Sequence, residues 1–124
     1  MNRFISAVLF ASFLIGTGAI AQAAETYNCH GTEPFWSIEF DQTSGTYADP
    51  MNESVAVKVD NKREAAGFSA GVATVFDIYA NGKKAVVAVT MNSCNNGMSD
   101  EEFDYQVVII GNDDVLMGCC RVTK

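Results

Sequence analysis

Apolar and polar residues alternate along much of the chain after residue 24. The segment FWSIEF places Trp36, Ile38 and Phe40 on one side and polar residues mainly on the other. Successive side chains of a strand point to opposite faces, so this period of two predicts strands with one buried face. Further strands are predicted at VAVKVD (55–60), VATVFDIYA (72–80), KAVVAVTM (84–91), YQVVIIG (105–111) and VLMGCCRV (115–122). KAVVAVTM is apolar on both faces, which favours a central strand.

Turn sequences separate these segments. Asn81-Gly82 predicts a tight hairpin because both residues tolerate positive φ, and Gly111–Asp114 predicts a second hairpin. Asp41–Asn52 is interpreted as a loop with room for one short strand, and Asn61–Gly71 as a connection or the end of a strand. Ser99 with Glu102 three residues later matches a capping box, so one short helical turn is expected there.

This pattern predicts a single all-β domain over residues 24–124. We expect a small antiparallel β-barrel or sandwich of six to eight strands with one short helical turn. β-Branched and aromatic residues, which strands favour, are enriched throughout the segment.

Residues 1–23 have the three parts of a secretory signal peptide. Arg3 gives a basic start, residues 4–20 form an uncharged apolar run, and Ala21-Gln22-Ala23 matches a cleavage site. Ala19-Ile20-Ala21 is a competing cleavage site, and an N-terminal membrane anchor is the alternative to cleavage. We expect a periplasmic or secreted protein without stable membrane insertion after cleavage.

The chain is acidic, with a formal net charge of −7 at pH 7. An acidic surface repels nucleic acid and anionic lipid, so neither is an expected partner. A basic protein or a cation is compatible with this charge. The expected partner is an envelope protein, a cell-wall fragment or a small molecule.

Four cysteines in a short exported chain predict two disulfides. Cys119 and Cys120 are neighbours on one predicted strand and point to opposite faces, so each should reach a different partner. The pairing is either Cys94–Cys119 with Cys29–Cys120, or the swap. A metal could bind Cys29, His30, Cys119 and Cys120 if the termini meet, but the C-x-x-C spacing of such sites is missing. No metal and no cofactor are expected.

Carboxylates are the next candidates for chemistry. Those at 100–104 do not fit the D-x-[DN]-x-[DN]-G frame of a calcium loop, and a capping box accounts for them. Glu33 precedes Pro34, which favours an extended backbone, and a single carboxylate is not a glycosidase pair. Trp36, with Phe35, is expected to anchor the core. No catalytic residue is expected.

Most of these residues fall within three longer motifs: GTEPFWSIEF (31–40), CNNGMSDEEFDYQVVI (94–109) and LMGCCR (116–121). Together they resemble an uncharacterised family of small exported bacterial proteins and lipoproteins. Its members carry a G-x-E-P-F-W start, a C-x-x-x-M-S-D middle and a G-C end, and are catalogued as hypothetical or predicted membrane proteins. This chain lacks the lipobox of the lipoprotein members, which favours a soluble form.

The resemblance implies that the GTEPFW segment meets Cys94–Asp100 and Gly118-Cys119 in the fold. It also favours the pairing Cys94–Cys119 with Cys29–Cys120. We expect a binding site at this meeting point, formed by Glu33, Trp36, Met98, Ser99 and Asp100.

The expected function is a non-enzymatic binding or stress-protection module of the bacterial envelope. One alternative is an inhibitor or partner of a basic envelope protein such as lysozyme, by analogy with the small acidic, disulfide-linked β-barrels that inhibit C-type lysozyme. The other alternative is a thiol- or metal-dependent enzyme.

Overall fold

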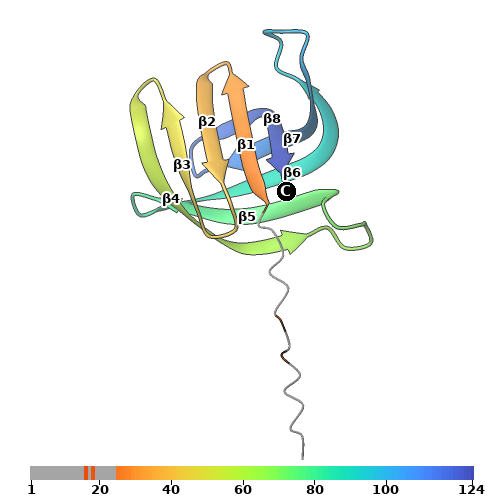
Figure 1. Ribbon diagram of the computed structural model, residues 1–124. Helices are drawn as coiled ribbons and strands as arrows, with labels where there is room; N and C mark the ends of the chain where they lie inside the picture. Colours follow the sequence, from red (N-terminus) through yellow and green to blue (C-terminus); the bar gives the residue numbers. More distant parts are fainter. Residues whose placement is uncertain (1–15, 17, 19–24) are drawn as a thin grey trace, which may run out of the picture.

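Eight antiparallel strands form a closed β-barrel in the computed structural model, which describes residues 16, 18 and 25–124 (Figure 1). The strands are β1 (Thr26–Thr32), β2 (Phe35–Phe40), β3 (Ser44–Asp49), β4 (Asn52–Glu64), β5 (Ala73–Ala80), β6 (Lys83–Asn95), β7 (Glu102–Ile110) and β8 (Val115–Thr123). Each pairs with its neighbours in sequence, and β8 pairs with β1. The predicted small antiparallel barrel is confirmed. The predicted signal peptide, residues 1–23, lies outside the described residues apart from Gly16 and Gly18.

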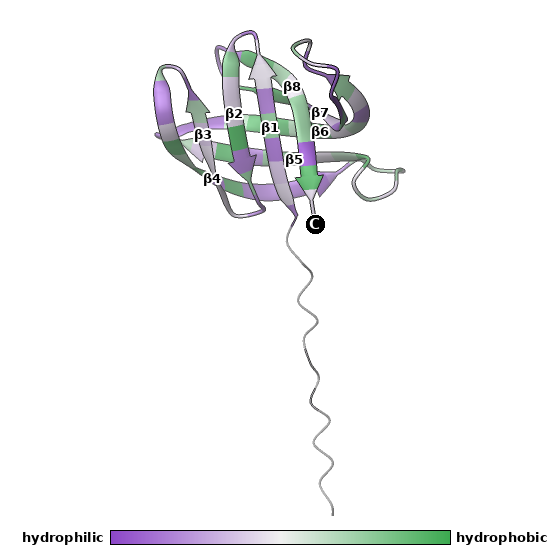
Figure 2. Ribbon diagram, turned by 45° about the horizontal axis from the view of Figure 1, so that its top comes forward, coloured by the Kyte–Doolittle hydropathy of each residue, from purple (hydrophilic) through white to green (hydrophobic). Residues whose placement is uncertain are grey.

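The apolar side of the alternating pattern fills the barrel. Figure 2 shows hydrophobic and hydrophilic segments following one another along the strands of the barrel. Ile38 and Phe40 of β2 are each 1% exposed. Full burial of such a side chain stabilises the fold by roughly 1.5–3 kcal/mol. The rings of Tyr27, Phe40 and Phe76 pack together with centroids 4.9–5.3 Å apart. These aromatic rings fill the end of the barrel at which β1 begins.

The two tight hairpins were predicted correctly. Asn81 and Gly82 both have positive φ, at 51° and 75°, and connect β5 to β6. Gly111 donates its N–H to the Asp114 carbonyl at 2.9 Å in the turn between β7 and β8.

Two strands carry little sequence pattern. β1 was not predicted as a strand, and β3 lies within the segment interpreted as a loop with one short strand. The inward positions of β1 are Tyr27, Cys29 and Gly31, and Gly45 and Tyr47 alternate on β3, so neither strand shows a β-branched alternation. Both strands are formed because they pair with a neighbour on each side.

The predicted helical turn at Ser99–Glu102 is wrong. Residues 97–100 form bends, and β7 already begins at Glu102, which pairs with Asn95 across the β6–β7 hairpin. The Ser99 hydroxyl accepts the N–H of Glu101, two residues ahead, at 3.2 Å, so it closes a turn rather than capping a helix. Among the described residues, no helix is long and apolar enough to cross a membrane.

Two disulfides hold the barrel, and they join the pairs that the resemblance favoured. Cys29 and Cys120 face each other across the β1–β8 pair, with Cα atoms 4.0 Å apart, and lie in the core. Cys119 points outward and bonds Cys94 at the end of β6, with Cα atoms 5.5 Å apart. The two bridges lie on opposite faces of β8, as the strand alternation requires. Two disulfides fit an oxidising compartment.

Candidate functional site

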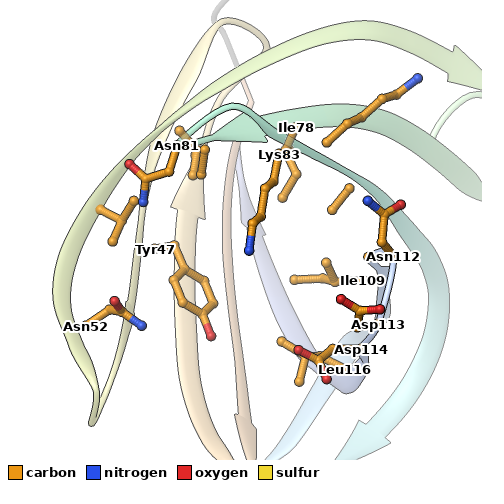
Figure 3. A pocket seen from close by; sticks show the side chains of 16 residues that line it. Tyr47, Asn52, Ile78, Asn81, Lys83, Ile109, Asn112, Asp113, Asp114 and Leu116 are labelled. Atoms are coloured by element: carbon orange, nitrogen blue, oxygen red, sulfur yellow. The ribbon is translucent and has the colours of Figure 1, made fainter.

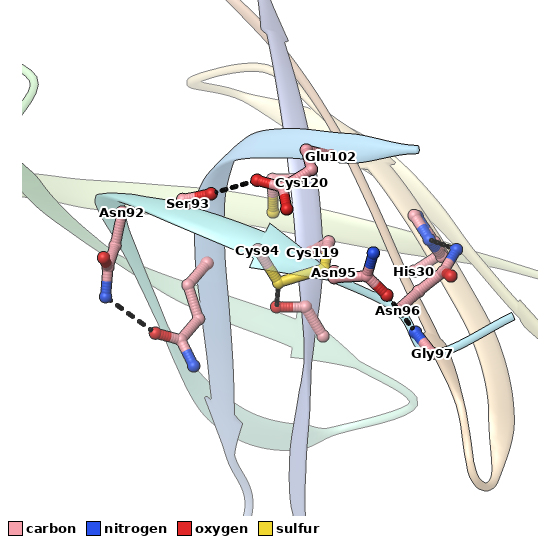
Figure 4. Close-up of a disulfide and its surroundings, with 12 residues drawn as sticks. His30, Asn92, Ser93, Cys94, Asn95, Asn96, Gly97, Glu102, Cys119 and Cys120 are labelled. Atoms are coloured by element: carbon pink, nitrogen blue, oxygen red, sulfur yellow. Dashed lines mark hydrogen bonds between the residues drawn. A yellow bond between two sulfur atoms is a disulfide. The ribbon is translucent and has the colours of Figure 1, made fainter. Parts of the chain in front are cut away.

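The β1–β2 hairpin meets the loop between β6 and β7 (Figure 4). The Thr32 hydroxyl donates to the Asn96 carbonyl at 3.0 Å, and the Asn96 side-chain amide lies 3.2 Å from His30 Nε2. The Cys94–Cys119 bridge fixes the base of this loop against β8, with Cys94 Sγ 3.4 Å from the Gly118 carbonyl. The three motif segments therefore lie together in the fold.

Trp36 is a core residue at this junction, since it is only 4% exposed. Its indole packs over two glycines: a Cβ on Gly31 would overlap the indole Nε1, and one on Gly118 would lie 3.0 Å from Cζ2. The glycines of GTEPFW and LMGCC thus make room for the ring. The prediction that Phe35 joins it in the core is wrong, because Phe35 is 56% exposed on the opposite face of β2.

A shallow apolar hollow of about 460 Å³ lies beside Trp36. Phe35, Pro50 and Met98 contribute to its lining, and Met98 is 66% exposed. This hollow brings together two of the residues that were predicted to bind, Trp36 and Met98.

The remaining predicted binding residues do not join that hollow. Glu33 is exposed in the β1–β2 turn and borders a separate hollow of about 250 Å³ with His30 and Asn96. Ser99 and Asp100 line neither hollow. Within residues 25–124, neither Glu33 nor Asp100 makes a side-chain hydrogen bond or an ion pair. Glu33 therefore does not hold the corner through its carboxylate.

His30 packs against the outer surface of the barrel. Its ring meets the Phe103 ring edge to face at 4.9 Å, and the Arg121 guanidinium lies 5.1 Å from the centre of Phe103. Arg121 also pairs with Glu101. This stack covers the Cys119 side of β8, so His30 has a packing role that the sequence did not reveal.

The four cysteines leave no thiolate for a metal, because all are in disulfides. Among the residues that the structure describes, no group of three or more His, Cys, Asp and Glu side chains lies close enough to hold a metal ion.

A further opening with an apolar wall is the mouth of the barrel, which the sequence pattern did not indicate (Figure 3). It measures about 460 Å³ and lies at the end where the β3–β4, β5–β6 and β7–β8 turns gather. Aliphatic side chains form its inner wall: Val55, Val57, Ile78, Ala80, Ala85, Ile109 and Leu116. A concave apolar wall with polar groups at its edge is typical of a small-molecule site, and barrel mouths are a common location.

The rim of the mouth is polar. Lys83 reaches across the opening between Tyr47 and Ile109, with Asp113 and Asp114 on the far side (Figure 3). Among the described residues, Lys83 forms no ion pair. Its ammonium group is therefore available to a ligand.

Tyr47 has a fixed hydroxyl at this rim. Burial raises the pKa of Tyr47 to about 12, and its bond to the Asp49 carboxylate, 2.8 Å long, acts in the same direction. The phenol therefore stays protonated at neutral pH and donates to Asp49. The ring presents an apolar face to the mouth while its hydroxyl is already satisfied.

The mouth could not be read from the sequence because its wall is assembled from most of the strands. Both nearby turns, Asn81-Gly82 and Gly111–Asp114, were recognised, and an all-antiparallel order places them at the same end. Whether side chains fill the barrel near these two turns, or leave an opening there, depends on the geometry of the closed barrel.

Asp77 is a buried carboxylate outside the mouth, 4% exposed on the outer face of β5. The Asn61 amide at 2.8 Å lowers the pKa of Asp77, and Arg63 at 3.2 Å and Lys84 at 3.5 Å act in the same direction. Asn61 reaches it because a bulge in β4 turns the strand at φ 54°. Because Asn61, Arg63 and Lys84 all contact its carboxylate, we assign Asp77 a structural role.

Comparisons of the chain with protein-family models, with curated proteins and with solved structures find no match, so the family resemblance of the three motifs stays a prediction.

Proposed function

We propose that this protein is a non-enzymatic exported binding module, periplasmic or secreted, that takes a small amphipathic molecule into the mouth of its barrel. The observation that carries the proposal is the mouth itself, an apolar cavity of about 460 Å³ with a polar rim. Ligand pockets commonly measure about 300–1,000 Å³. A stress-protection role would follow if the ligand were a harmful amphiphile.

The chemistry of the mouth favours a ligand with an apolar body and an anionic group. The aliphatic wall suits the body, because burying apolar surface stabilises a complex. Lys83 suits the anionic group, since it has no competing carboxylate within 4.0 Å among the described residues. Asp113 and Asp114 on the far side of the rim disfavour a second anionic group there.

The alternatives rest on other features. An acidic chain with the apolar hollow beside Trp36 is compatible with a basic envelope partner such as lysozyme, and binding that weakens with salt would favour it. A thiol-dependent enzyme would need one of the disulfides to open.

Titration with 8-anilinonaphthalene-1-sulfonate, an apolar dye with one anionic group, tests the proposed mouth site. We expect saturable fluorescence with the wild type and its loss in Ala85→Trp, because the indole fills the mouth. Lys83→Glu should weaken binding of this dye about tenfold while leaving the neutral dye N-phenyl-1-naphthylamine bound.

The matched control is Ala56→Trp, which places the same side chain on the exposed outer face of β4. It should bind both dyes like the wild type. Unchanged dye binding in a folded Ala85→Trp variant would show that the mouth is not the site.

A further inference from the structure

Residues 85–89 of β6 and 107–110 of β7 are apolar on both faces, although only one face lines the barrel. Val87 and Val107 are fully buried inside. Their neighbours Val86, Ala88 and Val108 point outward, because successive strand residues face opposite sides. In a closed barrel the outward positions normally meet water, so an apolar outer side needs another explanation.

The strand register assembles these outward residues into two rows across four strands. One row runs Val75, Ala88, Val108 and Met117, and the other runs Asp77, Val86, Ile110 and Val115. Asp77 is the single polar member, and Arg63 and Lys84 already neutralise it. We call the other residues the outer apolar face: Val75, Val86, Ala88, Val108, Ile110, Val115 and Met117.

The outer apolar face is exposed at its β7–β8 side. Val115 is 64% exposed, Met117 59% and Ile110 48%. No helix among the described residues covers it. Soluble proteins rarely expose contiguous apolar patches of this kind, and such patches mark interaction sites.

The charges at one end of this face match a second copy of the same face. Lys84 stands at the β5–β6 turn, where its side chain stays 54% exposed although it pairs with Asp77. Asp113 and Asp114 stand at the β7–β8 turn, at the same end of the barrel. A two-fold axis parallel to the strands brings β6 of one copy opposite β7 of the other, and β5 opposite β8. Lys84 of each copy then faces the aspartates of the other, which makes the surface self-complementary.

We propose that the outer apolar face is the interface of a symmetric dimer of this chain. The faces pack as two sheets, and the mouths of both barrels stay open because they lie inside the strands. Anionic lipid does not suit this face, given the net charge of −7. The proposal is independent of the ligand proposed for the mouth.

Sedimentation velocity of the purified, oxidised protein tests this interface. We expect a concentration-dependent dimer in the wild type. Val115→Lys and Met117→Lys should each weaken the dimer at least about tenfold, with circular dichroism verifying that the barrel is intact. Both side chains are mostly exposed, so the variants should fold.

Met51→Lys is the matched control, because Met51 is 90% exposed on the β3–β4 turn, away from the outer apolar face. It should dimerise like the wild type. Asp113→Lys combined with Asp114→Lys should also weaken the dimer, because it opposes like charges. A wild type that stays monomeric up to about 1 mM, or that binds neutral phosphatidylcholine vesicles without dimerising, would overturn the proposal, as would folded lysine variants that dimerise normally.

Discussion

At the scale of single residues, Trp36 explains two glycines that stand 87 positions apart in the chain. Gly31 pairs with Trp36 across β1 and β2, and Gly118 follows on β8, so the indole lies over both. A side chain at either position would take the space of the ring or of the backbone beneath it. Packing thus accounts for Gly31 and Trp36, as it does for His30 beside them.

Gly118→Ala should lower the free energy of unfolding by about 1–3 kcal/mol, the usual cost of overpacking. The added methyl group would overlap the His30 carbonyl, which cannot move aside like a flexible side chain. Urea unfolding checks this. Gly111→Ala is the control, because the nearest atom there is the Asp114 carbonyl at 3.4 Å. Equal stability of both variants would contradict this account of Gly118.

At the scale of elements, the bulge in β4 lets the last residues of this strand bind the Asp77 carboxylate of β5, an arrangement that we call the Asp77 clamp. Residues 61–64 were interpreted as a connection or a strand end, and they continue β4 beyond the bulge. Asn61 and Arg63 both reach Asp77 from this segment. An outward carboxylate on β5 is thus held by the neighbouring strand.

Acid unfolding should report this clamp. The pKa of Asp77 is lower in the folded chain than its ordinary value, so its contribution to stability is complete above that value and is lost as the pH falls through the folded pKa. Asp77→Asn should therefore lose less stability than the wild type between about pH 5 and pH 2. Some loss remains, because hydrogen bonds also lower the pKa of Asp41 and Asp49.

Unfolding by urea at each pH measures this slope. Asp104→Asn, which changes an exposed carboxylate of β7, should keep the wild-type slope. The clamp would be disproved by an Asp77→Asn variant whose stability falls with pH as steeply as that of the wild type.

At the scale of the whole molecule, the Cys29–Cys120 bridge joins the first strand to the last and so crosses the seam that closes the barrel. It spans 91 residues of sequence, whereas Cys94–Cys119 spans 25. A longer closed loop restricts the unfolded chain more.

Replacing Cys29 and Cys120 by alanine should therefore destabilise the protein more than replacing Cys94 and Cys119. The chain-entropy relation gives about 4.6 and 3.5 kcal/mol. Urea unfolding without reductant compares the two double variants. A larger loss of stability on removing Cys94–Cys119 would contradict this prediction, and would mean that the end of β6 depends on its bridge more than the β1–β8 seam does.

Several features followed from the sequence because they depend on neighbouring residues. Alternation at FWSIEF identifies a strand whatever its partner, and Asn81-Gly82 identifies a tight turn through its two positive φ angles. The capping box at Ser99 failed for the opposite reason: pairing of Glu102 with Asn95 overrides a weak local preference for a helical turn.

The sequence by itself determined an all-β chain with two disulfides, because strand alternation depends on neighbouring residues and the number of cysteines is a matter of composition. Only the tertiary structure decided that the sheet closes, that Phe35 is exposed beside the buried Trp36, that Glu33 and Asp100 stand apart, and that apolar residues of β5 to β8 align on the outside. Closure and register depend on pairings between distant strands, and the interior volume depends on the closed geometry. The mouth and the outer apolar face arise from those pairings.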